Sequence, residues 1–286
     1  MTAATGLFLV DKPPGPSSFG VLRTLRPALG KKLGHAGTLD PFAGGLLLVL
    51  AGRATRLATF LSGLDKTYRA VVQFGATSIT LDPEGEIEPT GQTATREQLD
   101  AAVPPLIGPV LQRVPVASAV KLDGERSYVR MRRGEAVEPA PRMVRIDRLE
   151  IEAFDAGTQR ATLFVACSKG TYVRQIAADL GQATGAGAYC AELVRTSVGP
   201  FRVEDAASPE RVAADPAGPW HLTPADALPH LPARQLTELE CERVSHGRPL
   251  EGAGERGPTR LVAGGELLAI GEPRDGALRP VVVLAP

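Results

Sequence analysis

The chain has 286 residues, of which 43% are hydrophobic, so it can bury a sizeable core in one large domain or in one large and one small domain. Its 32 basic and 32 acidic residues balance, which excludes an overall charge that by itself points to a nucleic-acid partner. The sequence contains no signal-like segment and no apolar run of membrane-spanning length, so we expect a soluble, cytoplasmic protein.

The charged residues are unevenly distributed along the chain. Residues 1–70 contain nine basic and three acidic side chains, residues 71–110 contain one and six, and residues 111–150 contain nine and six. Two basic segments therefore flank an acidic one. A basic face of this kind can bind phosphates, although ordinary surface variation explains the same pattern.

Cysteine and histidine show neither a metal-binding pattern nor a disulfide framework. The three cysteines are far apart and form no Cys-x-x-Cys pair, which indicates free thiols in a reducing compartment. The four histidines have no metal-ligand spacing. We therefore expect no metal site.

Hydrophobic periodicity predicts six elements in the first quarter of the chain. They are a strand over residues 6–10, a helix capped by Ser17 or Ser18, a glycine-rich loop over residues 34–45, a strand over residues 46–50, an amphipathic helix over residues 54–61 and a strand over residues 66–74. Tyr68 lies at the start of the last strand, where a side chain can face an open cleft. A single tyrosine can equally be a core aromatic with a satisfied hydroxyl.

The glycine-rich loop is the densest cluster of conformationally special residues. It begins Gly34-His35-Ala36-Gly37-Thr38-Leu39-Asp40-Pro41 and continues Phe42-Ala43-Gly44-Gly45. Pro41 fixes its own φ and pushes Asp40 toward an extended conformation. A carboxylate on such a rigid loop is either a structural cap or a working acid, base or nucleophile, and the local features leave both interpretations open.

The rest of the chain alternates between strands and helices. The predicted elements are an acidic surface loop or hairpin over residues 77–92, a helix over 95–103 capped by Thr95, a strand over 115–121, a turn at Asp123-Gly124, a basic helix over 127–133, paired strands over 144–154 and 161–167, a helix over 172–183 capped by Thr171, a strand over 189–198, a linker over 205–220, and a β-rich module from about residue 221 with a helix over 236–244 and strands over 259–262, 267–270 and 279–284. The arginines of the basic helix suit the backbone phosphates of a nucleic acid, and they equally suit a solvated helix. We expect a mixed α/β (α+β) main domain, residues 1–210, with a largely antiparallel central sheet.

One arginine lies where the dipole of its predicted helix is unfavourable for a cation. Arg174 lies in the first turn of the helix predicted over residues 172–183, where the helix dipole disfavours a cation. A nearby anion is the simplest compensation, and Asp40 is a candidate.

Five segments, in this order, resemble the TruB family of pseudouridine synthases, to which dyskerin-type enzymes are related. They are Asp11-Lys12-Pro13-Pro14-Gly15-Pro16-Ser17-Ser18, the loop from Gly34 to Pro41, Lys66-Thr67-Tyr68-Arg69, Ser168-Lys169-Gly170-Thr171-Tyr172-Val173-Arg174, and Leu193-Val194-Arg195-Thr196-Ser197-Val198-Gly199. The resemblance covers about residues 6–202. The region 221–286 is similar to the small PUA-type RNA-binding domain often attached to these enzymes.

The resemblance implies a role for each matching residue. Asp40 would be the catalytic carboxylate that attacks a flipped-out uridine, and Arg174 would pair with it. Tyr68 would stack on the base and take part in proton transfer. The remaining roles are to hold the target nucleotide out of the RNA stack (His35), to line the uracil pocket (Tyr172 and Leu193), and to support the site (Lys12 and Lys169).

The resemblance also implies the reaction and the partner. The expected activity is isomerisation of the T-loop uridine of tRNA, position 55, to pseudouridine, by a monomer that binds the T-arm stem-loop and needs no metal, cofactor or membrane. Two alternatives remain open from the sequence: a guide-RNA-dependent subunit of the dyskerin type, and an RNA-binding or tRNA-folding chaperone. A generic aspartate-dependent hydrolase is a poor third, since the loop carries only one carboxylate.

Overall fold

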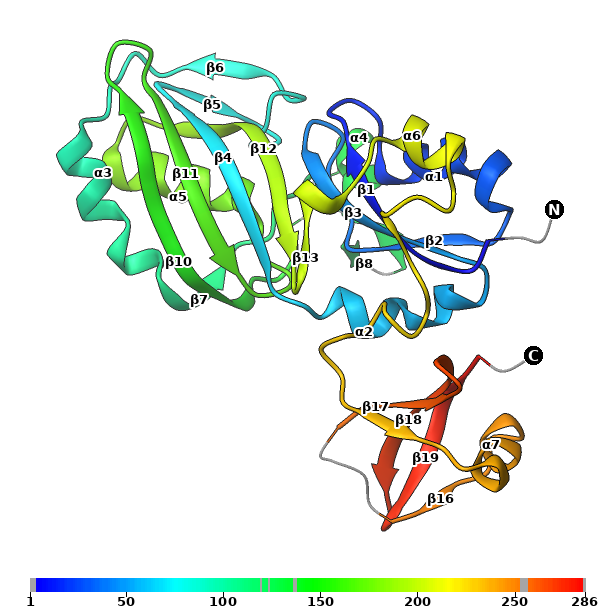
Figure 1. Ribbon diagram of the computed structural model, residues 1–286. Coiled ribbons are helices and arrows are strands. Elements are labelled where there is room, and N and C mark those ends of the chain that lie inside the picture. The colour runs from blue at the N-terminus through cyan, green and yellow to red at the C-terminus, as the bar shows by residue number, and fades with distance from the viewer. Residues whose placement is uncertain (1–3, 119, 123, 136–137, 253–256, 285–286) are drawn as a thin grey trace. The chain divides into compact units, whose positions relative to one another are not determined.

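The computed structural model describes residues 4–118, 120–122, 124–135, 138–252 and 257–284 (Figure 1). Contacts divide the chain into two compact units. The first comprises Met1–Asp40, Gly45–Ser62 and Gly199–Pro286, and the second comprises Pro41–Gly44 and Gly63–Val198. Asp40 is therefore the last residue of the first unit before the chain enters the second.

The first unit contains antiparallel strands built from strongly apolar sequence. Strand β1 pairs with β14 on one side and with β3 on the other, and β2 also pairs with β3. All eight residues of β3 are buried, as its unbroken apolar run predicts. The elements are β1 (Gly6–Lys12), α1 (Ser18–Leu29), β2 (Leu33–Ala36), β3 (Gly44–Ala51), η1 (Gly52–Leu57), α2 (Ala58–Ser62), β13 (Phe201–Arg202), η3 (Val203–Asp205), α6 (Pro209–Ala214) and β14 (His221–Leu222).

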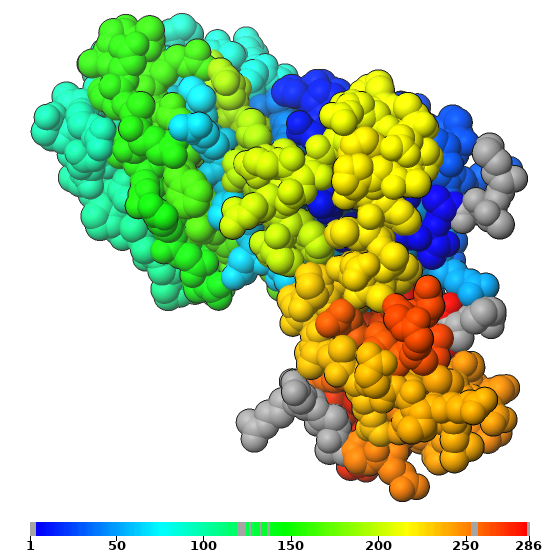
Figure 2. All heavy atoms as spheres, in the orientation of Figure 1, coloured from blue at the N-terminus to red at the C-terminus, as the bar shows by residue number. Residues whose placement is uncertain are grey.

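The predicted linker over residues 205–220 is wrong. Ala207 accepts a hydrogen bond from the amide of Asp11 at 2.8 Å and donates its own amide to Leu9 at 3.2 Å, while α6 buries Val212. Figure 2 shows this yellow segment as a compact mass against the blue N-terminal elements. Its alanine- and proline-rich composition is typical of a linker, and only a few of its residues are buried, so the sequence did not indicate a core segment.

The second unit contains five antiparallel strands in the order β12-β4-β11-β10-β7. Alternate residues of β4 are buried, and helix α5 packs on this buried face (Figure 1). The elements are β4 (Lys66–Phe74), β5 (Ala76–Ser78), β6 (Ile87–Pro89), α3 (Arg96–Ala102), η2 (Pro104–Leu106), β7 (Gly108–Gln112), β8 (Lys121–Leu122), β9 (Glu125–Arg126), α4 (Ser127–Arg132), β10 (Arg142–Asp155), β11 (Arg160–Cys167), α5 (Val173–Thr184) and β12 (Ala188–Val198). The mixed α/β class with a mostly antiparallel sheet is confirmed.

Three further element predictions need correction, and a fourth lies partly outside the described residues. The strand predicted over residues 115–121 is reduced to β8, and the pattern missed β7. Strand β2 shortens the predicted glycine-rich loop, so His35 lies on a strand. The helix predicted over residues 54–61 is a 3-10 turn followed by the five-residue α2. In the predicted turn at Asp123-Gly124, Asp123 lies outside the described residues.

The C-terminal part folds around its own small core. Five strands have the order β15-β17-β18-β19-β16, and β15 and β17 are parallel. Thr237 caps α7 in a capping box with Glu240. The elements are β15 (Ala233–Gln235), α7 (Glu238–Ser245), β16 (Leu250–Glu251), β17 (Thr259–Ala263), β18 (Glu266–Arg274) and β19 (Ala277–Val283), and the core residues are Val244, Leu250, Leu261, Ala269 and Leu278. The helix and three strands predicted here are confirmed.

Candidate functional site

A buried serine fixes the main chain next to Asp40. The hydroxyl of Ser18, in the first turn of α1, donates to the carbonyl of Leu39 and accepts from its amide, both at 2.9 Å. Ser18 and Leu39 are almost fully buried, whereas Asp40 is half-buried. Gly37, with φ of 86°, allows the left-handed turn between β2 and this clamp. The main chain that leads into Asp40 is therefore fixed at Leu39, while the side chain of Asp40 keeps some exposure.

Two other predicted residues lie in the same unit as Asp40. His35 is opposite Val49 in the β2–β3 ladder and is half-buried. Lys12 ends β1 and is fully buried, and its ammonium donates to the carbonyl of Pro13 at 3.1 Å. Lys12 is therefore an interior residue at the end of the strand that leads toward Ser18. Burial of a lysine is costly unless its charge is compensated.

Tyr68 and Leu193 share the buried face of the second unit's sheet. Tyr68 is opposite Arg195 of β12, and Leu193 is opposite Ala70 of β4. Directly opposed residues of antiparallel strands point to the same side, so all four lie on one face. The structure thus brings together the aromatic and the aliphatic side chain that the sequence assigned to the base pocket.

Tyr172 is held at both its backbone and its ring. It is the N-cap residue of α5, and the side chain of Gln112 accepts from its amide at 2.8 Å and donates to its carbonyl at 3.0 Å. The guanidinium of Arg142 donates to its hydroxyl at 2.6 Å and lies 4.6 Å from the centre of its ring. The predicted cap by Thr171 is wrong, because that hydroxyl donates to the carbonyl of Ser168 instead.

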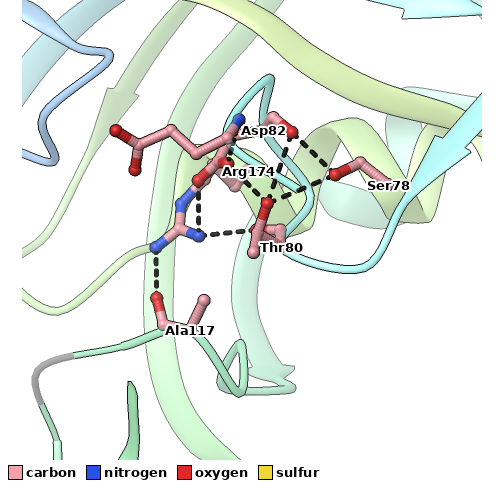
Figure 3. Close-up of polar contacts among 6 residues, drawn as sticks. Ser78, Thr80, Asp82, Ala117 and Arg174 are labelled. Carbon is pink, nitrogen blue, oxygen red and sulfur yellow. Dashed lines mark hydrogen bonds and ion pairs between the residues drawn. The ribbon is translucent and has the colours of Figure 1, made fainter. Parts of the chain in front are cut away.

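Arg174 finds an anion within its own unit. Its guanidinium donates to a carboxylate oxygen of Asp82 at 2.9 Å, to the carbonyl of Thr80 at 2.6 Å and to the carbonyl of Ala117 at 2.8 Å (Figure 3). Arg174 and Asp82 are each only 2% exposed. The predicted compensation at this helix N-terminus therefore includes Asp82. The pairing of Arg174 with Asp40 stays a prediction.

Asp82 was missed because its segment reads as an acidic surface loop. The segment is a hairpin of β5 and β6, as one of the two alternatives predicted, but its tip turns inward at Leu81, which has φ of 64°. The second carboxylate oxygen of Asp82 accepts from the hydroxyl of Thr80 at 2.5 Å and from the amide of Glu84 at 3.0 Å. The Asp82-Pro83 pair repeats the Asp40-Pro41 pair, but Asp215-Pro216 does so too, so the sequence holds no signal that singles out Asp82.

Two buried cations on the Tyr68 face were also missed. Arg195 is 1% exposed and Lys66 is 7% exposed, on the same face of β12 and β4. Burial, followed by the neighbouring Arg195, lowers the pKa of Lys66 to about 8. Burial raises the pKa of the Cys167 thiol, which lies opposite Lys66, to about 11, so this cysteine is an inert core thiol.

The remaining predicted basic residues are on the surface. Lys169 is exposed in the turn before α5. On the basic helix α4, Arg130 pairs with Glu135 at 2.7 Å and the following Arg133 pairs with Glu125 at 2.5 Å, which favours a solvated helix over a phosphate site. Within the described part of the chain no group of three or more His, Cys, Asp or Glu could hold a metal ion, and no helix is long and apolar enough to cross a membrane.

Sequence comparison places the chain in a family. Residues 26–173 match the family described as "TruB family pseudouridylate synthase (N terminal domain)", and residues 231–285 match "tRNA Pseudouridine synthase II, C terminal". The chain belongs to the TruB family. A protein named tRNA pseudouridine synthase B from Parasynechococcus marenigrum (strain WH8102) is 41% identical, and the alignment covers 99% of this chain and 98% of that protein. A protein of the same name from Stutzerimonas stutzeri (strain A1501) is 40% identical over 96% and 94%.

Solved structures agree with the TruB fold. A chain from the crystal structure of a Cbf5-Nop10-Gar1 complex superposes with a TM-score of 0.76 at 24% identity, covering 99% of this chain and 85% of that chain. A chain from an H/ACA RNP bound to a substrate RNA containing 2′-deoxyuridine superposes with a TM-score of 0.75 at 22% identity, over 99% and 86%. At this level of identity the likeness concerns the fold alone.

Proposed function

We infer that this protein is an enzyme that isomerises a uridine of tRNA to pseudouridine, and we propose that the target is the T-loop uridine at position 55. The observation that carries the inference is about 40% identity, along nearly the whole chain, to proteins named tRNA pseudouridine synthase B. The clamp of Ser18 on the Asp40 loop supports it, because a nucleophile must be held in a fixed position to react.

In the proposed reaction Asp40 attacks the flipped-out uridine as a carboxylate nucleophile. The C1′–N1 bond breaks, the uracil turns, a C1′–C5 bond forms, and the bond that Asp40 made to the nucleoside breaks, which restores the free carboxylate. The proton on C5 is released and N1 is left protonated, so atoms balance with no leaving group and no change of oxidation state. Tyr68 and Leu193, on one face of neighbouring strands, would hold the base during this rotation.

We propose that Arg174 stabilises the ionised Asp40 while Asp82 fixes the guanidinium. One terminal nitrogen of the guanidinium donates to Thr80 and Asp82, and the other donates to Ala117. The guanidinium is therefore immobilised before substrate arrives, which is the condition for electrostatic preorganisation. In the same proposal His35 holds the target nucleotide outside the RNA stack, Tyr172 lines the pocket, and Lys12 and Lys169 support the site.

We further propose a domain division and a setting for this activity. Residues 1–210 would form the catalytic domain and residues 221–286 a PUA-like RNA-binding module. The enzyme would act as a monomer on the T-arm stem-loop in the cytoplasm, where its tRNA substrate is processed, without a metal or cofactor.

A T-arm RNA transcript incubated with the purified protein tests the proposal. Pseudouridine mapped only to position 55, with no added protein or guide RNA, is the expected result. A matched transcript with cytidine at that position should remain unmodified. Dependence on a guide RNA would support the dyskerin-type alternative, and tight binding without modification would support a chaperone.

A further inference from the structure

Helix α1 carries an exposed stripe of one aromatic and several cationic side chains. Phe19, Arg23 and Arg26 are spaced by four and three residues, which places them within an arc of about 60° at 3.6 residues per turn. All three are exposed, Phe19 by 55%, opposite the buried face formed by Val21, Leu22 and Leu25. The exposed Lys31 and Lys32 follow the helix directly. We call these five residues the α1 stripe.

The cations of the α1 stripe have no carboxylate partner among the residues that the structure describes. Helix α1 itself contains no acidic residue, and no ion pair involves Arg23, Arg26, Lys31 or Lys32 there. Arg26 instead lies over the ring of Phe19, with its guanidinium carbon 5.3 Å from the ring centre. Four positive charges and an exposed aromatic face are thus available to an external partner.

The arginines on the outer face of the second unit's sheet show the opposite arrangement. Each of four exposed arginines pairs with a carboxylate within 2.7 Å, in the pairs Arg69–Glu152, Arg145–Asp147, Arg148–Glu150 and Arg160–Glu192. A phosphate would have to displace a carboxylate there. The positive charges on the outer sheet face are therefore paired with carboxylates, whereas those of the α1 stripe are not, although the protein as a whole is neutral.

The α1 stripe is tied to the Asp40 loop at both ends of the helix. Ser18, which precedes Phe19, forms the clamp on Leu39, one residue before Asp40. At the other end Lys32 is three residues before His35, a separation of at most about 10 Å. The 12-residue helix between them is about 18 Å long. A polyanion that passes Asp40 could therefore contact the exposed side of this helix with several of its charged groups.

We propose that the α1 stripe binds the sugar–phosphate backbone of tRNA beside the target nucleotide, with Phe19 stacking on an unpaired base. The choice of tRNA rests on the proposed function. The chemistry itself, cations for phosphates and an aromatic face for a base, is that of a single-stranded or looped nucleic acid. It adds a binding surface outside the residues that hold the uridine.

The test is tRNA binding measured as a function of KCl concentration. The slope of log K against log [salt] is negative, and each lost phosphate contact should reduce its magnitude by about 0.7–0.9. We expect the double variant Arg23→Gln/Lys31→Gln to reduce the magnitude of the slope by about 1.5 and to weaken tRNA binding about tenfold or more at 0.1 M salt. Phe19→Ala should weaken binding about fivefold or more with the slope unchanged.

The control is the charge-matched variant Arg69→Gln/Arg148→Gln, which should bind with the wild-type affinity and slope. Equal slopes for the α1 and control variants, at wild-type folding by circular dichroism, would overturn the proposal. So would an α1 variant that binds tRNA with the wild-type affinity. Binding that depends on the α1 stripe without any pseudouridine formation would instead refute only the proposed function.

Discussion

The chain has three Asp-Pro pairs, and in two of them, at Asp40 and Asp82, the carboxylate is held differently. At Asp40 a neutral serine binds the backbone of the preceding residue, and the side chain stays half-buried. At Asp82 the side chain is 2% exposed, and both of its oxygens accept hydrogen bonds. Proline restricts both aspartates in the same way, so burial is what distinguishes them. Asp82 positions other groups, whereas Asp40 is the carboxylate proposed to react.

The largest effect is expected at Asp40. Asp40→Asn keeps the size of the side chain and removes the nucleophile, so pseudouridine formation should fall at least about 1,000-fold. Affinity for tRNA should stay within about threefold. Loss of tritium from C5-labelled tRNA measures the rate, and filter binding measures the affinity. Normal turnover would refute the assignment of Asp40.

The next effect concerns the arginine that Asp82 holds. Arg174→Leu should lower the rate about 100-fold or more, because Asp82 and the proposed Asp40 pairing lose their cation. Arg174→Lys should recover little, since a lysine cannot reach Thr80, Asp82 and Ala117 with one planar group. Single-turnover kinetics at saturating tRNA separates this loss from weaker binding. An unchanged rate in Arg174→Leu would contradict the proposed role.

Asp82→Asn tests whether the second aspartate is structural. It leaves Arg174 buried without its countercharge, so the free energy of unfolding in urea should fall by about 3 kcal/mol. Glu86→Gln makes the same change of charge on an exposed residue of the same hairpin and should change stability by less than about 0.5 kcal/mol. Equal stability of the two variants would show that the buried pair contributes little.

A smaller effect is expected from the clamp beside Asp40. Ser18→Ala removes two buried hydrogen bonds to Leu39 and should cost about 2 kcal/mol of stability. It should also slow the reaction about tenfold, because the Asp40 loop is less well positioned. Ser17→Ala, which removes the exposed helix cap, is the control and should cost about 1 kcal/mol without an effect on rate. Equal rates in both variants would exclude a role for the clamp in positioning.

The smallest effect is a pH dependence at Lys66. Its pKa is lowered to about 8 in the folded protein, so the unfolded chain binds the additional proton between about pH 8 and pH 10.5. Stability relative to Lys66→Met should therefore be lowest below pH 8 and should rise by about 2 kcal/mol up to pH 10.5. Urea unfolding at several pH values measures this difference. A difference that does not vary with pH would mean that Lys66 keeps an ordinary pKa.

Local sequence patterns predicted most strands and helices correctly. The alternation in residues 66–74 and the capping box at Thr95 are local signals, and β4 and α3 follow them. Prediction failed where burial depends on distant partners. The core role of Val212 and the inward tip at Asp82 come from contacts with segments far away in the chain, which composition and periodicity do not report.

The sequence by itself determined the α/β class, the family resemblance and the set of candidate residues, because motifs and apolar periodicity are local properties. The tertiary structure decided how those residues are held. Asp82 meets Arg174 across 92 positions of the chain, and Ser18 meets Leu39 across 21, only because sheet and helix packing brings their backbones together. A buried charge or hydroxyl must find its partner wherever packing places one, and the depth of burial distinguishes the structural aspartate from the one proposed to react.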